Sequence, residues 1–185
     1  RMNRLVGDLM SLNRVEGNER VRPTQRVVLN DIIQSTCHSL QPLALQAGVK
    51  FEFESPELPV EIYGDSDQLT QVFTNIIGNA LKYGASGGRI TLRMTTIARE
   101  AALRAPGVRL QVIDYGAGID PVHLPRLTER FYRVDGHRSR ELGGTGLGLA
   151  IVKHIINRHR GKLNIKSALG EGTTVTVMLP TEPLS

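Results

Sequence analysis

"GGTGLGLAIV", residues 143–152, places four glycines within six positions and then continues as an apolar helical pattern. A glycine inside a helix costs roughly 0.5–1 kcal/mol relative to alanine, because its backbone loses more freedom on folding. Such a cluster is expected where the backbone must bend or where a ligand must approach it closely. The stretch therefore indicates a ligand-binding or moving loop ahead of a helix, and an ordinary flexible connection is the alternative.

The length and composition of the chain fit one globular domain. The chain has 185 residues, of which 40% are hydrophobic, and this suffices for one buried core with at most a short appendage. Apolar runs are short, and the first residues, "RMNRLVGDLM", lack the apolar segment of a signal peptide. We therefore expect this piece to lie in the cytoplasm.

The net charge of +5 raises the possibility of a nucleic-acid partner. Aromatic residues make up only 4%, tryptophan is absent and no zinc-finger spacing occurs, so we expect no nucleic-acid binding. Arginines are concentrated just before the glycine cluster, at Arg126, Arg130, Arg133, Arg138 and Arg140. Their guanidinium groups suit a polyphosphate ligand, and a solvated charged face is the alternative.

Hydrophobic periodicity predicts the order of the elements. Helices are expected over 1–16, from a cap at Asn30 to Gly48, from a capping box at Asp65 and Gln68 to about Leu81, and from the glycine cluster to about residue 160. The helix at 1–16 carries a stripe that should pack against a partner helix. Strands are expected near 49–53, 60–62, 88–97, 107–114, 162–167 and 173–179.

This order predicts an α/β fold, a two-layer sandwich in which helices cover one face of a mixed sheet. A doubly wound parallel sheet fits less well, because consecutive strands here often lack a helix between them.

The stretch "TNIIGNALKYG", residues 74–84, brings polar groups to one side of a helix. Asn75, Asn79 and Lys82 fall within about 60° of one another, opposite the apolar stripe. Amide oxygens can help to hold Mg²⁺, which also uses water and phosphate oxygens as ligands. Simple solvent contacts of this face are the alternative.

The stretch "VIDYGAGID", residues 112–120, carries Asp114 to the end of a strand, where Gly116 and Gly118 let the backbone turn closely. A buried acceptor at such a place can take a hydrogen bond from an amino group such as that of adenine. A plain turn is the alternative. No P-loop, Rossmann fingerprint or eukaryotic-type kinase motif set is present, so a nucleotide would be bound in another way.

Five motifs in order carry a resemblance: "NIIGNALKY", "DYGAGID", "RFYRV", "GGTGLGLAIV" and "GEGTTVTVMLP". They resemble the N, G1, F, G2 and G3 boxes of the catalytic and ATP-binding domain of sensor histidine kinases, within the superfamily of gyrase, Hsp90 and the mismatch-repair ATPases. The similarity covers about residues 26–180, and the run from Phe131 to Gly161 further resembles the phosphate-regulon sensor kinases. The resemblance implies a Bergerat ATP-binding fold, with about three helices on one sheet face and a mobile ATP lid.

The resemblance also implies roles for individual residues. Asn79 would be the Mg²⁺ ligand, Asn75 would support metal and phosphates, and Lys82 and Tyr83 would contact phosphate and nucleotide. Asp114 would accept from the adenine amino group, in a wall that contains Gly116, Gly118 and Ile119, with Thr173 at the same end. The lid and the joint that closes over the triphosphate would contain Phe131, Arg133, Arg138, Arg140, Gly144, Thr145, Gly146, Leu147 and Gly148.

By the same resemblance, residues 1–17 would be the end of a dimerisation and phosphoacceptor hairpin, 18–25 a linker, 26–181 the catalytic domain and 182–185 a tail. The chain would bind ATP and Mg²⁺ and donate the γ-phosphoryl group to a histidine on the missing hairpin, without a catalytic nucleophile of its own. A response regulator would receive the phosphate, and the parent protein would be a homodimer anchored in the cell membrane.

Three observations bear on the chemistry. Hydrolysing relatives carry glutamate where this chain has Asn75, and an amide cannot take the proton of a water, so we expect poor ATP hydrolysis. A hydrolysing clamp ATPase and a non-enzymatic nucleotide-gated module remain alternatives. "HSLQPL", residues 38–43, imitates a phosphoacceptor pattern but lacks the acid after His38, which is read as a surface histidine.

Overall fold

The computed structural model describes residues 2–133 and 146–182. Its helices are α1 (Met2–Asn18), α2 (Leu29–Ala47), α3 (Ser66–Tyr83) and α5 (Gly148–Arg158), with 3-10 turns η1 (Ala85–Gly87) and η2 (Pro121–Arg126). Its strands are β1 (Arg26–Val28), β2 (Lys50–Glu54), β3 (Glu61–Tyr63), β4 (Arg89–Glu100), β5 (Ala105–Asp114), β6 (Lys162–Ser167) and β7 (Thr173–Pro180).

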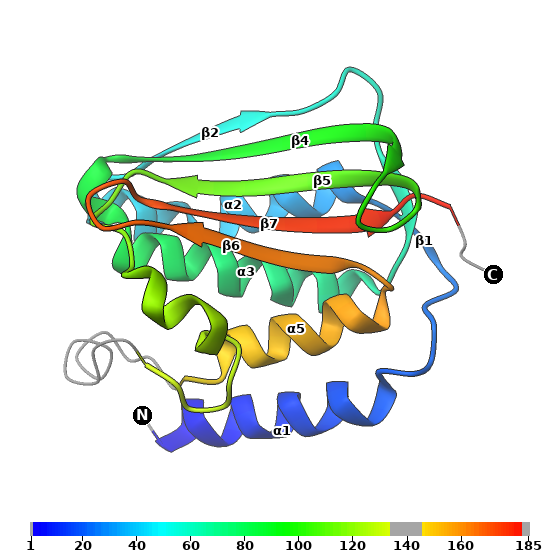
Figure 1. Ribbon diagram of the computed structural model, residues 1–185, viewed down its shortest axis with the longest axis horizontal. Coiled ribbons are helices and arrows are strands. Elements are labelled where there is room, and N and C mark those ends of the chain that lie inside the picture. Colours follow the sequence, from blue (N-terminus) through cyan, green and yellow to red (C-terminus); the bar gives the residue numbers. More distant parts are fainter. Residues whose placement is uncertain (1, 134–145, 183–185) are drawn as a thin grey trace.

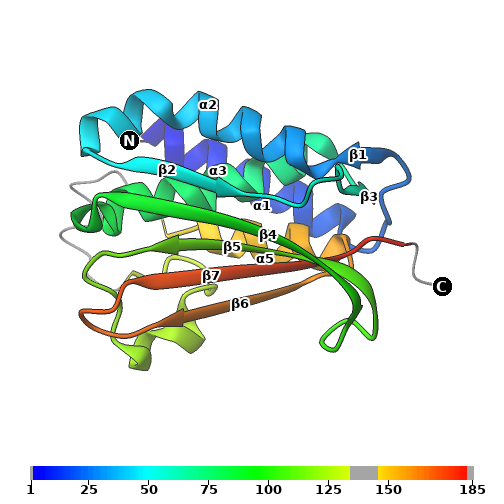
Figure 2. The same cartoon turned by 90° about the horizontal axis from the view of Figure 1, so that it is seen from above.

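Five strands form one mixed sheet in the order β2-β4-β5-β7-β6. β2 pairs with β4 in parallel, and the remaining neighbours are antiparallel. Helices α2, α3 and α5 cover one face of this sheet, as the two perpendicular views show (Figures 1 and 2). This arrangement confirms the predicted two-layer α/β sandwich with three helices on one face.

The central helix α3 follows its predicted pattern. Its apolar stripe, Leu69, Val72, Phe73, Ile76, Ile77, Ala80 and Leu81, is buried. Asp65 caps the helix by accepting the backbone N–H of Gln68 at 3.0 Å. The reciprocal half of the capping box is not formed, because the Gln68 side chain accepts instead from Arg158 of α5 at 2.9 Å. The α3 start is thereby tied to the end of α5.

The amino-terminal helix α1 lies against α5, on the side of the helical layer that faces away from the sheet (Figure 1). Leu12 and Val15 of α1 are buried. The predicted apolar stripe therefore packs against a helix, and in this structure that helix belongs to the same chain.

Two expectations near the second helix are corrected. Asn30 does not cap α2, which begins at Leu29; its side-chain oxygen accepts the N–H of Val60 at 2.7 Å instead. The residues before α2 form β1, a three-residue strand that pairs with β3 and was not predicted. A strand of three residues is too short to show an alternating pattern of apolar and polar residues. The chain enters α2 from this paired strand rather than from a capping side chain.

A buried histidine closes the carboxyl end of α5. His159 is 4% exposed, its Nε2 accepts the backbone N–H of Asp65 at 3.0 Å, and its Nδ1 donates to the carbonyl of Ile155 at 2.8 Å. Burial lowers the pKa of His159 from the usual 6.5, and the nearby Arg158 charge adds to this effect. The folded chain therefore holds His159 neutral.

Because His159 is buried as a neutral side chain, we expect the folded chain to lose stability in acid. Below pH 6.5 the unfolded chain takes up a proton that the folded chain refuses, so the free energy of unfolding should fall by up to about 1.4 kcal/mol per pH unit. Denaturant titrations from about pH 7 to about pH 5 measure this slope. His38→Gln, at an exposed position of α2, should leave the slope unchanged, whereas His159→Gln should reduce it. Equal slopes in the two variants would contradict the assignment.

Candidate functional site

Residues from separate parts of the sequence line one cavity of about 420 Å³, a size typical of ligand sites. Its walls come from α3, the end of β5 and the loop after it, the start of α5, and strands β6 and β7. Most of the predicted site residues that the structure describes lie here: Asn75, Asn79, Lys82, Tyr83, Asp114, Gly118, Ile119, Arg133, Gly146, Gly148 and Thr173.

The carboxylate of Asp114 is the buried polar group of this cavity, with 7% of the residue exposed. Its Oδ1 accepts the backbone N–H groups of Gly116 at 3.0 Å and Thr173 at 3.2 Å. Among the described residues, Oδ2 takes part in no hydrogen bond. Burial raises the pKa of Asp114, and the two N–H donors partly offset that rise. The remaining oxygen is an acceptor suited to a ligand that donates an N–H.

Two glycines allow the backbone to enclose this carboxylate. A Cβ on Gly84, at the end of α3, would lie 2.3 Å from Asp114 Cγ. Gly172, in the turn between β6 and β7, has φ 77°, and a Cβ there would lie 2.2 Å from the Asp114 carbonyl oxygen. Only glycine therefore fits where the helix end and the turn meet the end of β5.

Ser167 supports the same wall and was not predicted. Its Oγ accepts the N–H of Ile119 at 2.7 Å, donates to the carbonyl of Gly172 at 2.8 Å and contacts the Thr173 hydroxyl at 2.8 Å. These bonds join the loop after β5 to the β6–β7 turn. Ser167 ends a polar strand outside the recognised motifs, so its position in the sequence gave no signal.

The polar face of α3 forms the opposite wall. Asn75, Asn79 and Lys82 line the cavity together, as their spacing predicted. Asn75 Nδ2 donates to the carbonyl of Gly148 at 3.2 Å, which links α3 to the first residue of α5. Burial lowers the pKa of Lys82, and the positive charge of Arg4 lowers it further. A partly desolvated ammonium group of this kind favours an anionic ligand.

The segment that leads away from η2 contributes Tyr132 as well as the predicted Arg133. The Tyr132 hydroxyl contacts His123 Nδ1 at 2.5 Å, and the Arg126 guanidinium lies 4.4 Å from the Tyr132 ring centroid. Phe131 has φ 63° and is 54% exposed, and its N–H donates to the carbonyl of Gly146 at 2.8 Å.

Three predicted residues, Gly116, Phe131 and Leu147, do not line the cavity. Gly116 nevertheless contributes to the cavity, because its N–H donates to the Asp114 carboxylate. The predicted lid residues Arg138, Arg140, Gly144 and Thr145 lie outside the described residues.

Within residues 2–133 and 146–182, every helix is too short or too polar to span a membrane. No three His, Cys, Asp or Glu side chains gather there as a metal site. A cation at this cavity would therefore need other oxygen ligands, such as the Asn79 amide and the ligand itself.

Residues 64–183 match the family of histidine kinase-, DNA gyrase B- and HSP90-like ATPases, and the chain belongs to this family of ATP-binding domains. The phosphate regulon sensor protein PhoR of Pseudomonas aeruginosa is 40% identical over 177 residues, which cover 95% of this chain and 38% of that protein. The sensor histidine kinase WalK of Bacillus subtilis is 35% identical over 180 residues, which cover 97% of this chain and 28% of that protein. The chain thus spans less than half the length of these relatives.

Solved structures agree with the fold. The mycobacterial sensor histidine kinase MprB superposes with a TM-score of 0.71 at 28% identity, covering 87% of this chain and 99% of that one. Full-length ShkA in complex with AMPPNP superposes with a TM-score of 0.78 at 25% identity, covering 95% of this chain and 35% of that one. The cavity described above therefore belongs to the catalytic, ATP-binding fold of the sensor histidine kinases.

Two glycines of the β6–β7 turn offer a matched test of how closely this turn packs against Asp114. Gly170 (φ 81°) and Gly172 (φ 77°) both have left-handed backbone, so alanine should cost roughly 1–2 kcal/mol at either position. A Cβ at 170 meets no atom within 4 Å, whereas one at 172 would overlap the Asp114 carbonyl oxygen. Gly172→Ala should therefore lose about 1–3 kcal/mol more than Gly170→Ala and should also lose ATP affinity. Denaturant titration measures the loss of stability, and nucleotide titration measures the loss of ATP affinity. Equal effects of the two substitutions would contradict the close packing of the turn against Asp114.

Proposed function

We propose that this chain is the catalytic part of a two-component sensor histidine kinase, which binds Mg-ATP and donates the γ-phosphoryl group to a histidine of a dimerisation hairpin. The observation that carries the proposal is the pairing, across one cavity, of the buried Asp114 acceptor with the polar face of α3. A purine amino group and a metal-bound triphosphate are the two ends of ATP, and they need these two kinds of partner.

At the adenine end, the Asp114 carboxylate would accept from the exocyclic amino group. Gly116, Gly118 and Ile119 would form the wall around the base, with Thr173 beside it. The complex of ShkA with AMPPNP, an ATP analogue, supports nucleotide binding by this fold.

At the phosphate end, the residues present fit a magnesium ion. The Asn79 amide oxygen is a ligand of the hard type that Mg²⁺ prefers, and phosphate oxygens and water would complete the set. Bound Mg²⁺ would neutralise charge that develops on the transferred phosphoryl group. Lys82, Tyr83 and Arg133 would contact the nucleotide, and the N-terminus of α5 at Gly148 would favour phosphate through its N–H groups.

The lid residues Arg138, Arg140, Gly144 and Thr145 would complete this end of the site, together with Phe131, Gly146 and Leu147. Their role is proposed from the motif order alone, since four of them lie outside the described residues.

Transfer rather than hydrolysis is the chemistry this cavity supports. The Asn75 amide cannot accept a proton from water at neutral pH, and its Nδ2 is engaged by the Gly148 carbonyl. Catalysis would come from holding the γ-phosphoryl group in line with an incoming histidine nitrogen. The acceptor histidine would be supplied by the hairpin, and the chain would contribute no nucleophile.

We propose the following organisation for the parent protein. Residues 1–17 end the dimerisation hairpin, 18–25 form a linker, 26–181 are the catalytic domain and 182–185 are a tail. The parent protein would be a membrane-anchored homodimer that passes phosphate to the receiver domain of a response regulator. Similarity to PhoR makes a phosphate-limitation response the first to test.

Phosphotransfer in trans tests the proposed function. The chain is mixed with γ-labelled ATP, Mg²⁺ and the separately produced acceptor hairpin of the parent protein, and label on the hairpin histidine is measured. Label should appear and should be abolished by EDTA or by Gln in place of the acceptor histidine. The chain alone should release phosphate only slowly.

Asp114→Ala should lower ATP affinity about 10- to 100-fold, because it removes a charge-assisted hydrogen bond in a buried site. Asp120→Ala provides a matched control, since this exposed carboxylate caps the N–H of Val122 away from the cavity. If ATP binds and the hairpin stays unlabelled, the kinase proposal fails in favour of a binding module; rapid phosphate release by the chain alone would favour a hydrolysing ATPase.

A further inference from the structure

Helix α1 reaches the nucleotide cavity. Arg4 and Asp8, which lie one helical turn apart, line the same cavity as Asn79 and Lys82. Burial lowers the pKa of the Lys82 ammonium group, the Arg4 charge lowers it further, and Asp8 opposes this effect. Two cations from different helices therefore face the end of the cavity where the phosphates are proposed to lie. An anionic group between them would relieve their repulsion.

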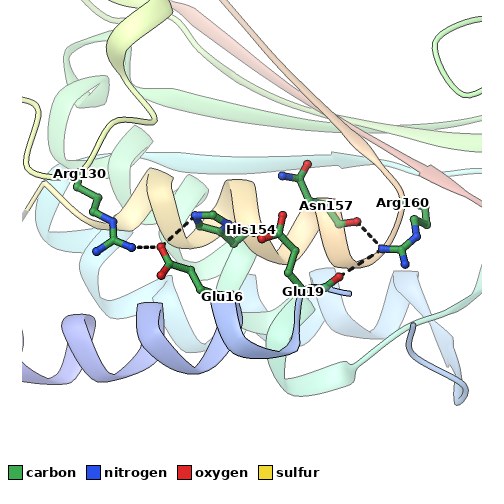
Figure 3. A network of polar contacts seen from close by, with 6 residues as sticks. All are labelled: Glu16, Glu19, Arg130, His154, Asn157 and Arg160. Atoms are coloured by element: carbon green, nitrogen blue, oxygen red, sulfur yellow. Dashed lines mark hydrogen bonds and ion pairs between the residues drawn. The ribbon is translucent and has the colours of Figure 1, made fainter. Parts of the chain in front are cut away.

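A histidine of α5 fastens the other end of α1. The Nδ1 of His154 lies 2.8 Å from Glu19 Oε2, and its Nε2 lies 3.3 Å from Glu16 Oε1 (Figure 3). Glu16 also pairs with Arg130, on the segment that leads to the lid. These contacts join the end of α1 to α5 and to the segment after η2.

Backbone contacts continue this attachment past the helix. Arg158 Nε donates to the carbonyl of Val21 at 2.7 Å, and Arg160 donates to the carbonyls of Glu19 at 3.3 Å and Arg20 at 3.2 Å. Figure 3 shows Arg160 beside Glu19 and Asn157 at the end of α5.

We propose that α1 is a movable wall of the nucleotide site: its Arg4 binds the phosphate groups of the nucleotide, and the contacts of His154 with Glu16 and Glu19 hold the wall in place. The inference rests on the proposed function, since it needs a nucleotide polyphosphate in this cavity. It adds a phosphate-binding residue from outside the five motifs, and it makes nucleotide affinity depend on where α1 lies. Release of α1 would withdraw Arg4 from the phosphates while leaving the adenine end unchanged.

Binding titrations with Mg-ATP and with adenosine test the role of Arg4. Arg4→Gln should weaken Mg-ATP about tenfold, the loss expected for one charge-assisted contact, and should leave adenosine affinity unchanged. Arg14→Gln, an exposed arginine on the same helix, makes the same change in net charge and should stay within about twofold of the unsubstituted chain. Equal effects of Arg4→Gln and Arg14→Gln would overturn the phosphate-binding role.

Amide hydrogen exchange without nucleotide tests the attachment by itself. His154→Gln should lower the protection factors of the α1 amides several-fold relative to the unsubstituted chain. His38→Gln is the control. The same His154→Gln chain should bind Mg-ATP several-fold more weakly, with adenosine unaffected. Protection that does not change with His154→Gln would overturn the attachment.

The two proposals fail in different ways. If the unsubstituted chain binds no ATP, the proposed function fails, whatever α1 does. If ATP binds and Asp114→Ala weakens it while Arg4→Gln and His154→Gln behave like their controls, the function stands and the inference about α1 fails.

Discussion

The enclosure of the Asp114 carboxylate by backbone is the constraint on which the site depends. The end of α3 and the β6–β7 turn both approach this residue so closely that a Cβ on Gly84 or Gly172 would overlap it. Three segments distant in sequence must therefore meet at the end of β5. Their meeting fixes one free carboxylate oxygen opposite the polar face of α3, and it gives the cavity an end that recognises a hydrogen-bond donor and an end that recognises an anion.

The two ends of the cavity differ in the secondary-structure elements that form them. The donor-recognising end rests on strands and on the Ser167 hydrogen bonds, which are short and partly buried. The anion-recognising end rests on helix faces and on side chains that reach it from α1, α3 and the segment after η2. Under the proposed function, a base held by the strands and phosphates held by side chains from helices would suit an enzyme that must release its phosphoryl group to a partner helix.

Sequence reasoning succeeded where one periodic segment carried the information by itself. The α3 stripe, the Asp65 cap and the shared face of Asn75, Asn79 and Lys82 follow from helical geometry alone. It failed where a tertiary contact decided the outcome. Asn30 does not cap α2, because its side-chain oxygen accepts the Val60 N–H and the residues before α2 pair as β1. Ser167 gained its role only because the turn folds back onto Ile119, and no local pattern records that contact. The stripe of α1 predicted a helical partner but could not say that α5 would be that partner, nor that Arg4 would reach the cavity.

The affinity of the chain for Mg-ATP compared with the magnesium complex of purine riboside triphosphate is the most direct measurement of the central claim. The two nucleotides share their phosphates and ribose, and purine riboside triphosphate carries a hydrogen in place of the amino group of adenine. A carboxylate acceptor facing that position should favour ATP by about tenfold or more, since its hydrogen bond to the amino group is lost in purine riboside triphosphate. Equal affinities for the two nucleotides would contradict the assignment of Asp114 as the group that recognises the base.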